Sequence, residues 1–159
     1  MVHWLPLAAG LQRSEHVPEP VDLLLQRATA HAGGANTSRK VAEKVAIVGS
    51  REGINRDAVF ERVKRLVWTY PSLKLTIVSG GARGVDTWAR EAAEAWHLEY
   101  QEFPADWETY GKSAGFKRNV DIVKAADLVN VFWNGKSNGA KNDIDLALRY
   151  RKDIEVRFP

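Results

Sequence analysis

From Lys44 onwards the chain alternates short apolar runs with amphipathic stretches, and this alternation restricts the fold more than any other feature. The apolar runs predict strands at residues 45–48, 73–78, 98–103, 128–132 and 154–158. The amphipathic stretches predict helices at residues 57–70, 85–96, 114–125 and 140–150. Strands that alternate with helices form right-handed βαβ units. The sequence therefore predicts an α/β fold, a Rossmann-like doubly wound and mainly parallel five-stranded sheet with helices on both faces.

The first forty residues differ from the rest of the chain. Prolines at positions 6, 18 and 20 and a Gly-, Ser- and Thr-rich stretch at 33–38 interrupt any regular pattern, leaving room for one short helix at 21–28. We therefore divide the chain into a partly ordered N-terminal extension, residues 1–40, and a Rossmann-like nucleotide-binding domain, residues 41–159. Apolar residues near the start, such as Trp4, pack on the domain or on a second subunit, unless the extension is simply a tail.

Composition excludes several kinds of site. The chain has no cysteine, which rules out disulfides, thiolate metal sites and cysteine nucleophiles. Its four histidines are scattered without metal-ligand spacing. We expect no metal and no cofactor. No apolar run reaches the roughly 18 residues of a membrane span, and the N-terminus lacks the basic region of a signal peptide. These observations predict a cytoplasmic protein without a membrane partner.

Charge bears on the partner. The net charge is +3, from 23 basic and 20 acidic residues that are interleaved along the chain. A small anion could bind such a surface, whereas a long nucleic acid is normally held by a stripe of basic residues. The sequence therefore favours a small ligand, and we do not expect a nucleic acid as the partner.

The loop after the second predicted strand, residues 80–86, is the strongest candidate for a ligand site, and we call it the glycine loop. Ligands of such sheets bind beyond the carboxyl ends of the strands. Glycine lets a ligand approach the backbone, and the helix that follows presents free N–H groups and a positive dipole end. We expect a phosphate to be bound by Gly80, Gly81, Ala82, Arg83 and Gly84. Asp86 either caps the helix or accepts ligand hydroxyls. The alternative for the whole loop is a tight turn without a ligand.

Three further loops should reach the same edge. The loop after the first strand offers Gly49, Ser50 and Arg51, although a plain turn is the alternative. The loop after the fourth strand offers Ser137 and Gly139 at a helix start, and Trp133 either stacks on a base or packs at the rim. The third loop, residues 103–115, suits a lid or is a surface loop, and it leads to Arg118 and Asn119 in the next helix.

Several short motifs in one order resemble the SLOG superfamily, and within it the YspA-like group of circularly permuted YpsA relatives. The motifs are VGSR at 48–51, SGGARGVD at 79–86, ADW at 105–107, GFKRN at 115–119, AD at 126–127 and WNGKSNG at 133–139. The resemblance spans about residues 45–158. The glycine loop is also similar to that of DNA-processing protein A.

The resemblance implies a Rossmann-like fold, a homodimer and a nucleotide-like ligand on the glycine loop. The superfamily includes phosphoribohydrolases, which cleave the N-glycosidic bond of nucleoside monophosphates and carry the pattern Pro-Gly-Gly-x-Gly-Thr-x-x-Glu. The nearest stretch here ends in Asp86 and lacks the proline and the threonine. We expect nucleotide binding, with N-glycosidic hydrolysis as the candidate reaction and Asp86 and Arg118 as its catalytic residues. The alternatives are a non-catalytic sensor of a nucleotide signal and a single-stranded DNA-binding protein of the DNA-processing protein A type.

Overall fold

A computed structural model describes residues 43–70 and 74–159, so the predicted extension and the start of the second predicted strand lie outside it. The described residues form one five-stranded sheet in the order β3-β2-β1-β4-β5. Every neighbouring pair of strands is parallel, which confirms the predicted α/β fold. The strands are β1 (Lys44–Gly49), β2 (Thr76–Ser79), β3 (Glu99–Glu102), β4 (Leu128–Phe132) and β5 (Asp153–Arg157).

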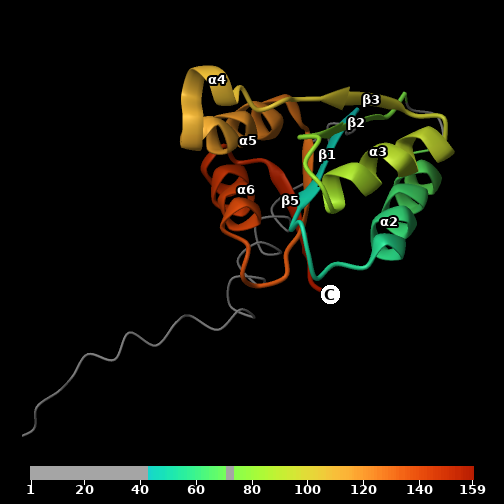
Figure 1. Cartoon of the computed structure of the whole chain (residues 1–159). Coiled ribbons are helices and arrows are strands. Elements are labelled where there is room, and N and C mark those ends of the chain that lie inside the picture. The colour runs from blue at the N-terminus through green and yellow to red at the C-terminus, as the bar shows by residue number, and fades with distance from the viewer. Residues whose placement is uncertain (1–42, 71–73) are drawn as a thin grey trace, which may run out of the picture.

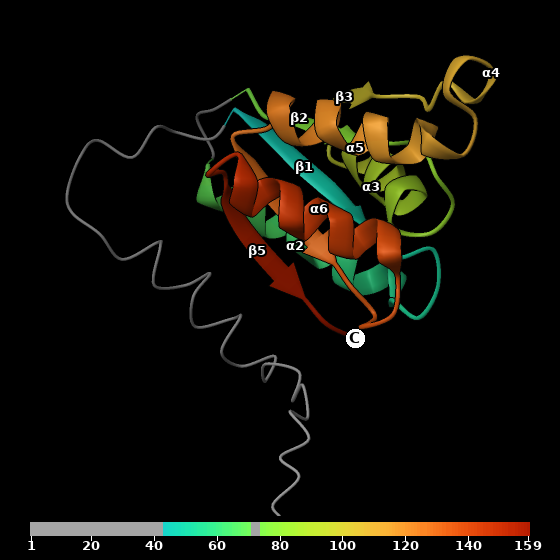
Figure 2. The same cartoon turned by 90° about the vertical axis from the view of Figure 1, so that its left-hand side faces the viewer.

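Helices cover both faces of the sheet. One face carries α2 (Arg56–Thr69) and α3 (Val85–Ala95), and the opposite face carries α5 (Ala114–Ala125) and α6 (Asn138–Arg149) (Figure 1). Figure 2 shows α5 and α6 side by side in front of the strands. None of these described helices is both long enough and apolar enough to cross a membrane.

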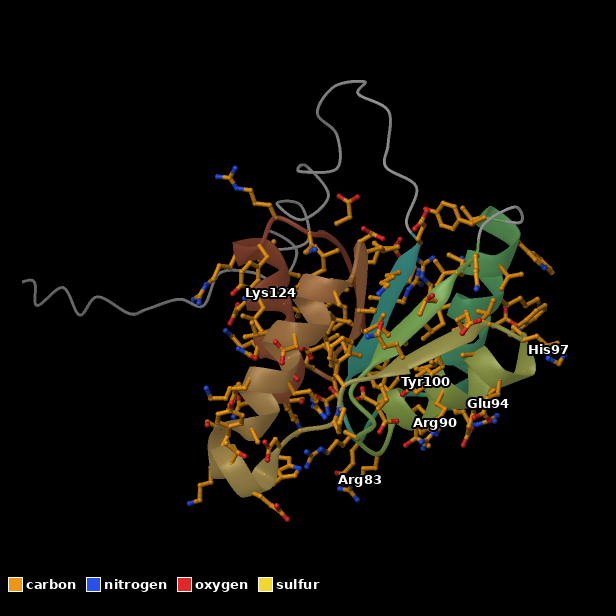
Figure 3. All side chains as sticks on the ribbon, turned by 90° about the horizontal axis from the view of Figure 1, so that it is seen from above. Arg83, Arg90, Glu94, His97, Tyr100 and Lys124 are labelled. Carbon is orange, nitrogen blue, oxygen red and sulfur yellow. The ribbon has the colours of Figure 1, made fainter. Side chains whose placement is uncertain are left out.

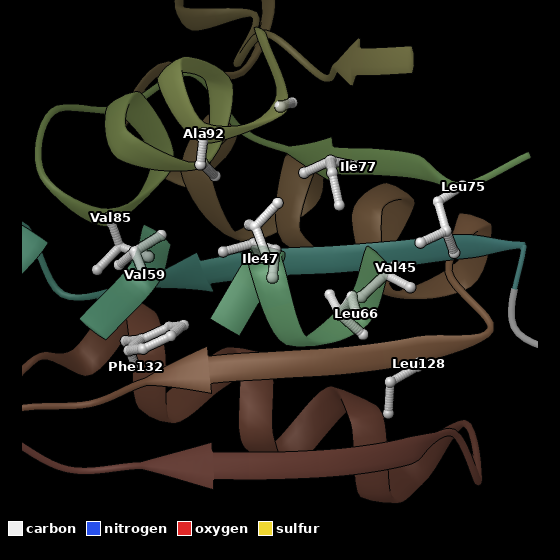
Figure 4. Packing of buried hydrophobic residues seen from close by; sticks show 13 residues of the cluster. Val45, Ile47, Val59, Leu66, Leu75, Ile77, Val85, Ala92, Leu128 and Phe132 are labelled. Carbon is white, nitrogen blue, oxygen red and sulfur yellow. The ribbon is translucent and has the colours of Figure 1, made fainter. Parts of the chain in front are cut away.

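The alternation of side chains along the strands builds two cores. In β1, Val45 and Ile47 face α2 and α3, whereas Ala46 and Val48 face α5 and α6. The first core continues through Val59 of α2 and Phe132 of β4 (Figure 4). Because β1 and β4 are buried on both faces, they read as nearly continuous apolar runs in the sequence, interrupted in β4 by the buried Asn130.

The predicted helix and strand boundaries agree with the structure to within two residues, except in the loop after β3 and at the start of β2, which was predicted at residue 73, outside the described residues. That loop, expected to be irregular, contains a short helix α4 (Trp107–Tyr110) and a 3₁₀ turn η1 (Gly111–Ser113). The Asp106 carboxylate accepts a hydrogen bond from the Thr109 N–H at 2.9 Å and so caps α4. A single turn of helix is too short to show a hydrophobic period, so pattern analysis missed it.

The strand order fixes where a ligand can bind. The chain moves from β1 outwards to β2 and β3, then crosses back through α5 to place β4 on the other side of β1. The loops after β1 and β4 therefore leave the sheet in opposite directions and open a crevice between them. Asn134 spans this junction, because its N–H donates to the Ser50 hydroxyl at 3.1 Å and its side-chain amide donates to the Glu52 carbonyl at 2.9 Å.

Candidate functional site

A cavity of about 580 Å³ lies at this junction, beyond the carboxyl ends of the strands. Most of the predicted site residues meet there although they come from distant parts of the chain. Those that line it are Gly49, Arg51, Ala82, Arg83, Asp86, Arg118, Asn119, Ser137 and Gly139. Figure 3 places Arg83 at this end of the molecule, between the two helix layers. Gly80 and Gly81 line an adjoining hollow of about 460 Å³.

Three predicted ligand-binding residues line neither space. Ser50 is buried, its N–H donates to the Phe132 carbonyl at 2.8 Å, and it joins the loops after β1 and β4. Gly84 caps α3 and packs against the Arg51 backbone. Trp133 supports the start of α6, since its indole N–H donates to the Ser137 carbonyl at 3.1 Å. These three residues support the loops and helices that line the cavity without lining it themselves. Trp133 is therefore not placed to stack on a base in the cavity.

The glycine loop is folded around Asp86. This carboxylate is only 4% exposed and accepts a hydrogen bond from the Ala82 N–H at 3.2 Å. Burial raises the pKa of Asp86 to about 6, while the nearby Arg118 guanidinium and the N–H groups of Ala82 and Gly80 oppose that rise. Two of the amides predicted to hold a phosphate therefore serve Asp86 instead. The N–H groups of Gly81 and Arg83 have no acceptor among the described residues, and both residues border the cleft.

Asp143 of α6 is a second buried carboxyl on the same cavity. It is 4% exposed, and its Oδ1 has no hydrogen-bond partner among the described residues. Burial raises the pKa of Asp143 well above its ordinary value, the charge of Asp86 raises it further, and Arg118 opposes both effects. A raised pKa favours the neutral form of a carboxyl, which can donate a proton or a hydrogen bond.

Arg118 is fixed between the two carboxyls. Its Nη1 donates to the Gly80 carbonyl at 2.9 Å, and its Nη2 donates to the Asn119 side-chain oxygen at 3.3 Å. Asn119 in turn donates to the Gly139 carbonyl at 3.4 Å, which ties α5 to the start of α6. The guanidinium is thus held in place by the backbone of the glycine loop and by α5, and Arg118 is part of the cavity lining.

Three other cations at the cavity have no anionic partner among the described residues. These are Arg51, Lys112 and Lys136, all exposed at the rim. Arg83 differs, because it is paired with Glu52. Unneutralised cations around a concave surface raise the local concentration of anions. The electrostatics of the cavity therefore suit a negatively charged ligand.

Sequence reasoning missed Asp143, Lys112 and Lys136, and two signals could have found the first of them. Asp143 occupies a core-facing position in the α6 stripe of Ala140, Leu146 and Ala147, where an acid is unusual. It also stands four residues after Gly139, as the glutamate of the phosphoribohydrolase pattern stands four residues after its last glycine. The two lysines carry no such signal, since exposed lysines are common.

We expect the free energy of unfolding to fall as pH rises through the range in which Asp86 titrates. The unfolded carboxyl has a pKa of 3.8 and the folded one about 6, so the folded state binds the extra proton between these values. The stabilisation is complete below about pH 4 and is lost by about pH 6, a difference of about 3 kcal/mol. Asp143 acts in the same direction.

Urea unfolding at pH 4 and pH 7 measures this effect. Asp86→Asn removes the titrating group, so its stability relative to the wild type should rise by about 3 kcal/mol between these two pH values. A difference between variant and wild type that is the same at both pH values would contradict the prediction.

Comparison with known proteins supports the fold and the family. The sequence pattern of the YspA, cpYpsA-related SLOG family matches residues 43–110. The Gene 61 protein of Mycobacterium phage D29 is 35% identical over 105 residues, covering 62% of this chain and 83% of the phage protein.

Two solved structures share the fold at low sequence identity. DNA processing protein A of Helicobacter pylori, studied for its single-stranded DNA binding mode, has a TM-score of 0.57 and 21% identity over 77% of this chain and 68% of its own. The protein of the same name from Streptococcus pneumoniae has a TM-score of 0.56 and 22% identity over 71% of this chain. The chain matches 49% of that protein, about half its length.

These neighbours correct one prediction. We did not expect a nucleic acid as partner, because the net charge is small and no basic stripe is visible in the sequence. That prediction is wrong, since the fold is shared with a protein that binds single-stranded DNA. A count of charges along the chain does not show where the tertiary structure gathers them. With the sequence match and the phage relative, the chain belongs to the YspA, cpYpsA-related SLOG family.

Proposed function

We propose that the cleft binds the phosphate of a nucleotide. The observation that supports this most strongly is the meeting of Arg51, Lys112 and Lys136, cations without an anionic partner among the described residues, on one cavity at the carboxyl edge of the sheet. Exposed cations gathered around a concave surface attract an anion to it. A phosphate at this point neutralises the cations and completes the site.

The start of α6 supplies the hydrogen-bond donors. The helix is 12 residues long, and its Ser137 cap accepts from the Ala140 N–H at 3.3 Å. The N–H groups of Asn138 and Gly139 have no acceptor among the described residues, and Gly139 lines the cavity. Unsatisfied N–H groups and the positive dipole end of a helix bind phosphate well. Gly139 and Ser137 thus take the role that the sequence assigned mainly to the glycine loop.

A nucleotide fits the rest of the cavity better than free phosphate does. Its volume of about 580 Å³ lies within the range of small-molecule sites, about 300–1,000 Å³. Buried polar groups at Asp86, Asn119 and Asp143 can meet ribose hydroxyls or base nitrogens, and Trp107 and Phe116 supply apolar walls. A nucleotide signal or substrate also suits the cytoplasmic location predicted from the sequence.

Calorimetric titration with nucleoside monophosphates, and with inorganic phosphate for comparison, tests the proposal. We expect Arg51→Ala to lower the affinity for the nucleotide by about tenfold, since a charge-assisted hydrogen bond contributes about 1.5–3 kcal/mol. Arg65→Ala is the matched control, because Arg65 is exposed on α2 and away from the cleft. Equal losses in both variants, or no binding by the wild type, would remove the proposed site.

Hydrolysis of the N-glycosidic bond is the second candidate, and the pair of buried carboxyls favours it. Asp143, held neutral, would give its proton to a nitrogen of the leaving base as the bond between that base and C1′ breaks. Asp86, ionised above about pH 6, would stabilise the positive charge on the sugar and accept the proton of the water that attacks C1′. The products are the free base and ribose phosphate.

Chromatography of nucleoside monophosphates incubated with the protein decides between the two functions. Release of free base supports the hydrolase. Binding without release supports a sensor that recognises the nucleotide and does not change it.

A further inference from the structure

The cleft continues beyond the nucleotide cavity into the second hollow, which lies along the ends of β2 and β3. Five residues line both spaces, namely Arg51, Ala82, Arg83, Trp107 and Arg118. The two hollows are therefore parts of one groove and not separate pockets. The second hollow adds about 460 Å³, which exceeds the lower limit of a small-molecule site, about 300 Å³.

Trp107 stands where the two hollows meet. It is the first residue of α4, and its side chain makes no hydrogen bond with any described residue. The ring lies beside Gly115, where an added Cβ would be 3.6 Å from it, and the residue is still 55% exposed. Phe116, on the wall of the first cavity, is 50% exposed. Half-exposed aromatic rings beside a groove provide stacking surfaces for bases.

The charges of the groove suit a chain of phosphates. Arg51, Arg83 and Arg118 border both hollows, so positive charge extends along the groove. The second hollow also holds Glu102, which is held 3.4 Å from Arg90 and lies against Gly81. This exposed carboxylate can accept hydrogen bonds from the amino group of a base. Cations along a groove, with aromatic rings and acceptors between them, are typical of sites for unpaired strands.

We propose that the groove holds a single-stranded oligonucleotide, with successive nucleotides in the two hollows and Trp107 stacked on a base where the hollows join. The inference rests on the proposed nucleotide site, because the first hollow supplies the anchor for one phosphate. A mononucleotide would leave the second hollow empty. A duplex keeps its bases paired, so none is free to lie on the indole ring.

Displacement of a fluorescein-labelled hexathymidylate, followed by fluorescence anisotropy at 150 mM salt, tests this inference. The competitors are thymidine 5′-monophosphate, the 5′-phosphorylated dithymidylate, its uridine counterpart and a short duplex. We expect the dinucleotide to compete at least tenfold better than the mononucleotide, in line with the effect of base stacking on aromatic residues, and the duplex to compete poorly. Comparison of the dithymidylate with its uridine counterpart shows whether the groove prefers DNA or RNA.

Variants at Trp107 separate stacking from charge. Trp107→Ala should bring the dinucleotide affinity down to that of the mononucleotide measured in the same variant, whereas Trp107→Tyr should keep most of the tenfold gain. Trp68→Ala is the control, since Trp68 is 67% exposed on α2 and lines neither hollow. Equal competition by mononucleotide and dinucleotide would overturn the oligonucleotide proposal while leaving the nucleotide site in place. Competition by neither would overturn both, and a loss in Trp68→Ala equal to that in Trp107→Ala would overturn the role of Trp107.

Discussion

Replacement of Asp143 by asparagine should lower the release of base from a nucleoside monophosphate by at least about a hundredfold, while nucleotide affinity stays within about threefold of the wild type. Asparagine occupies nearly the same space and still donates a hydrogen bond, but it has no proton to transfer, and general acid catalysis contributes about 10²–10⁴-fold. The effect should therefore fall on kcat and spare KM. Single-turnover release of base, followed by chromatography, measures it.

Stability provides an independent readout of the same substitution. Burial raises the pKa of Asp143, so the folded wild type loses stability as pH rises above the range in which the unfolded carboxyl ionises. Asp143→Asn removes this loss and should raise the free energy of unfolding at pH 8 relative to the wild type. Asp145→Asn is the control, because Asp145 is exposed and paired with Lys141 at 3.0 Å. A variant that releases base as fast as the wild type would exclude Asp143 as the acid.

Gly84→Ala should destabilise the protein by about 3–5 kcal/mol. Gly84 has φ +83°, which L-residues rarely adopt, and a Cβ there would stand 2.6 Å from the Arg51 carbonyl oxygen. Strain at such a dihedral costs about 1–3 kcal/mol, and overpacking costs a similar amount. The clash is with backbone, which cannot rotate away as a long side chain can.

Urea denaturation measures the loss, and Gly135→Ala provides the control. Gly135 also has a positive φ, +78°, but no described atom lies within 4 Å of the position of its added Cβ. That variant should lose only about 1–2 kcal/mol, from backbone strain alone. Nucleotide affinity of Gly84→Ala should fall as well, since the displaced backbone belongs to Arg51. Equal losses of stability in Gly84→Ala and Gly135→Ala would contradict the predicted clash between an alanine at position 84 and the Arg51 backbone.

The helices and strands could be predicted because their signals are local. The apolar run of β1 reflects four consecutive buried residues, and the stripe of α5 reflects burial of one helix face over about three turns. The predicted bounds of α5 match the structure. The order of the strands could not be read in this way. Which side of β1 receives β4 depends on the crossing of α5 over the sheet, a contact between parts of the chain about eighty residues apart.

The candidate site was predicted in part for the same reason. Glycine-rich turns after parallel strands must gather at one edge, so Arg51, Asp86 and Ser137 were expected to lie near one another, and all three line the cavity. By contrast, the hydrogen bond from the Ala82 N–H to the Asp86 carboxylate depends on where the Asp86 side chain points once α3 has packed on the sheet. Trp133 shows the same limit, because its partner Ser137 is set by how the loop folds back.

By itself, the sequence determined the class of fold, the edge of the sheet where the cavity opens and most of the predicted residues that meet there. These follow from periodicity and from turn chemistry, which act over a few neighbouring residues. Only the tertiary structure decided that Asp143 is buried with no hydrogen bond to its Oδ1 among the described residues, and that Trp107 lines both hollows. Burial and the field of distant charges arise only when helices and strands pack together, and they set the pKa values and the charge of the cleft.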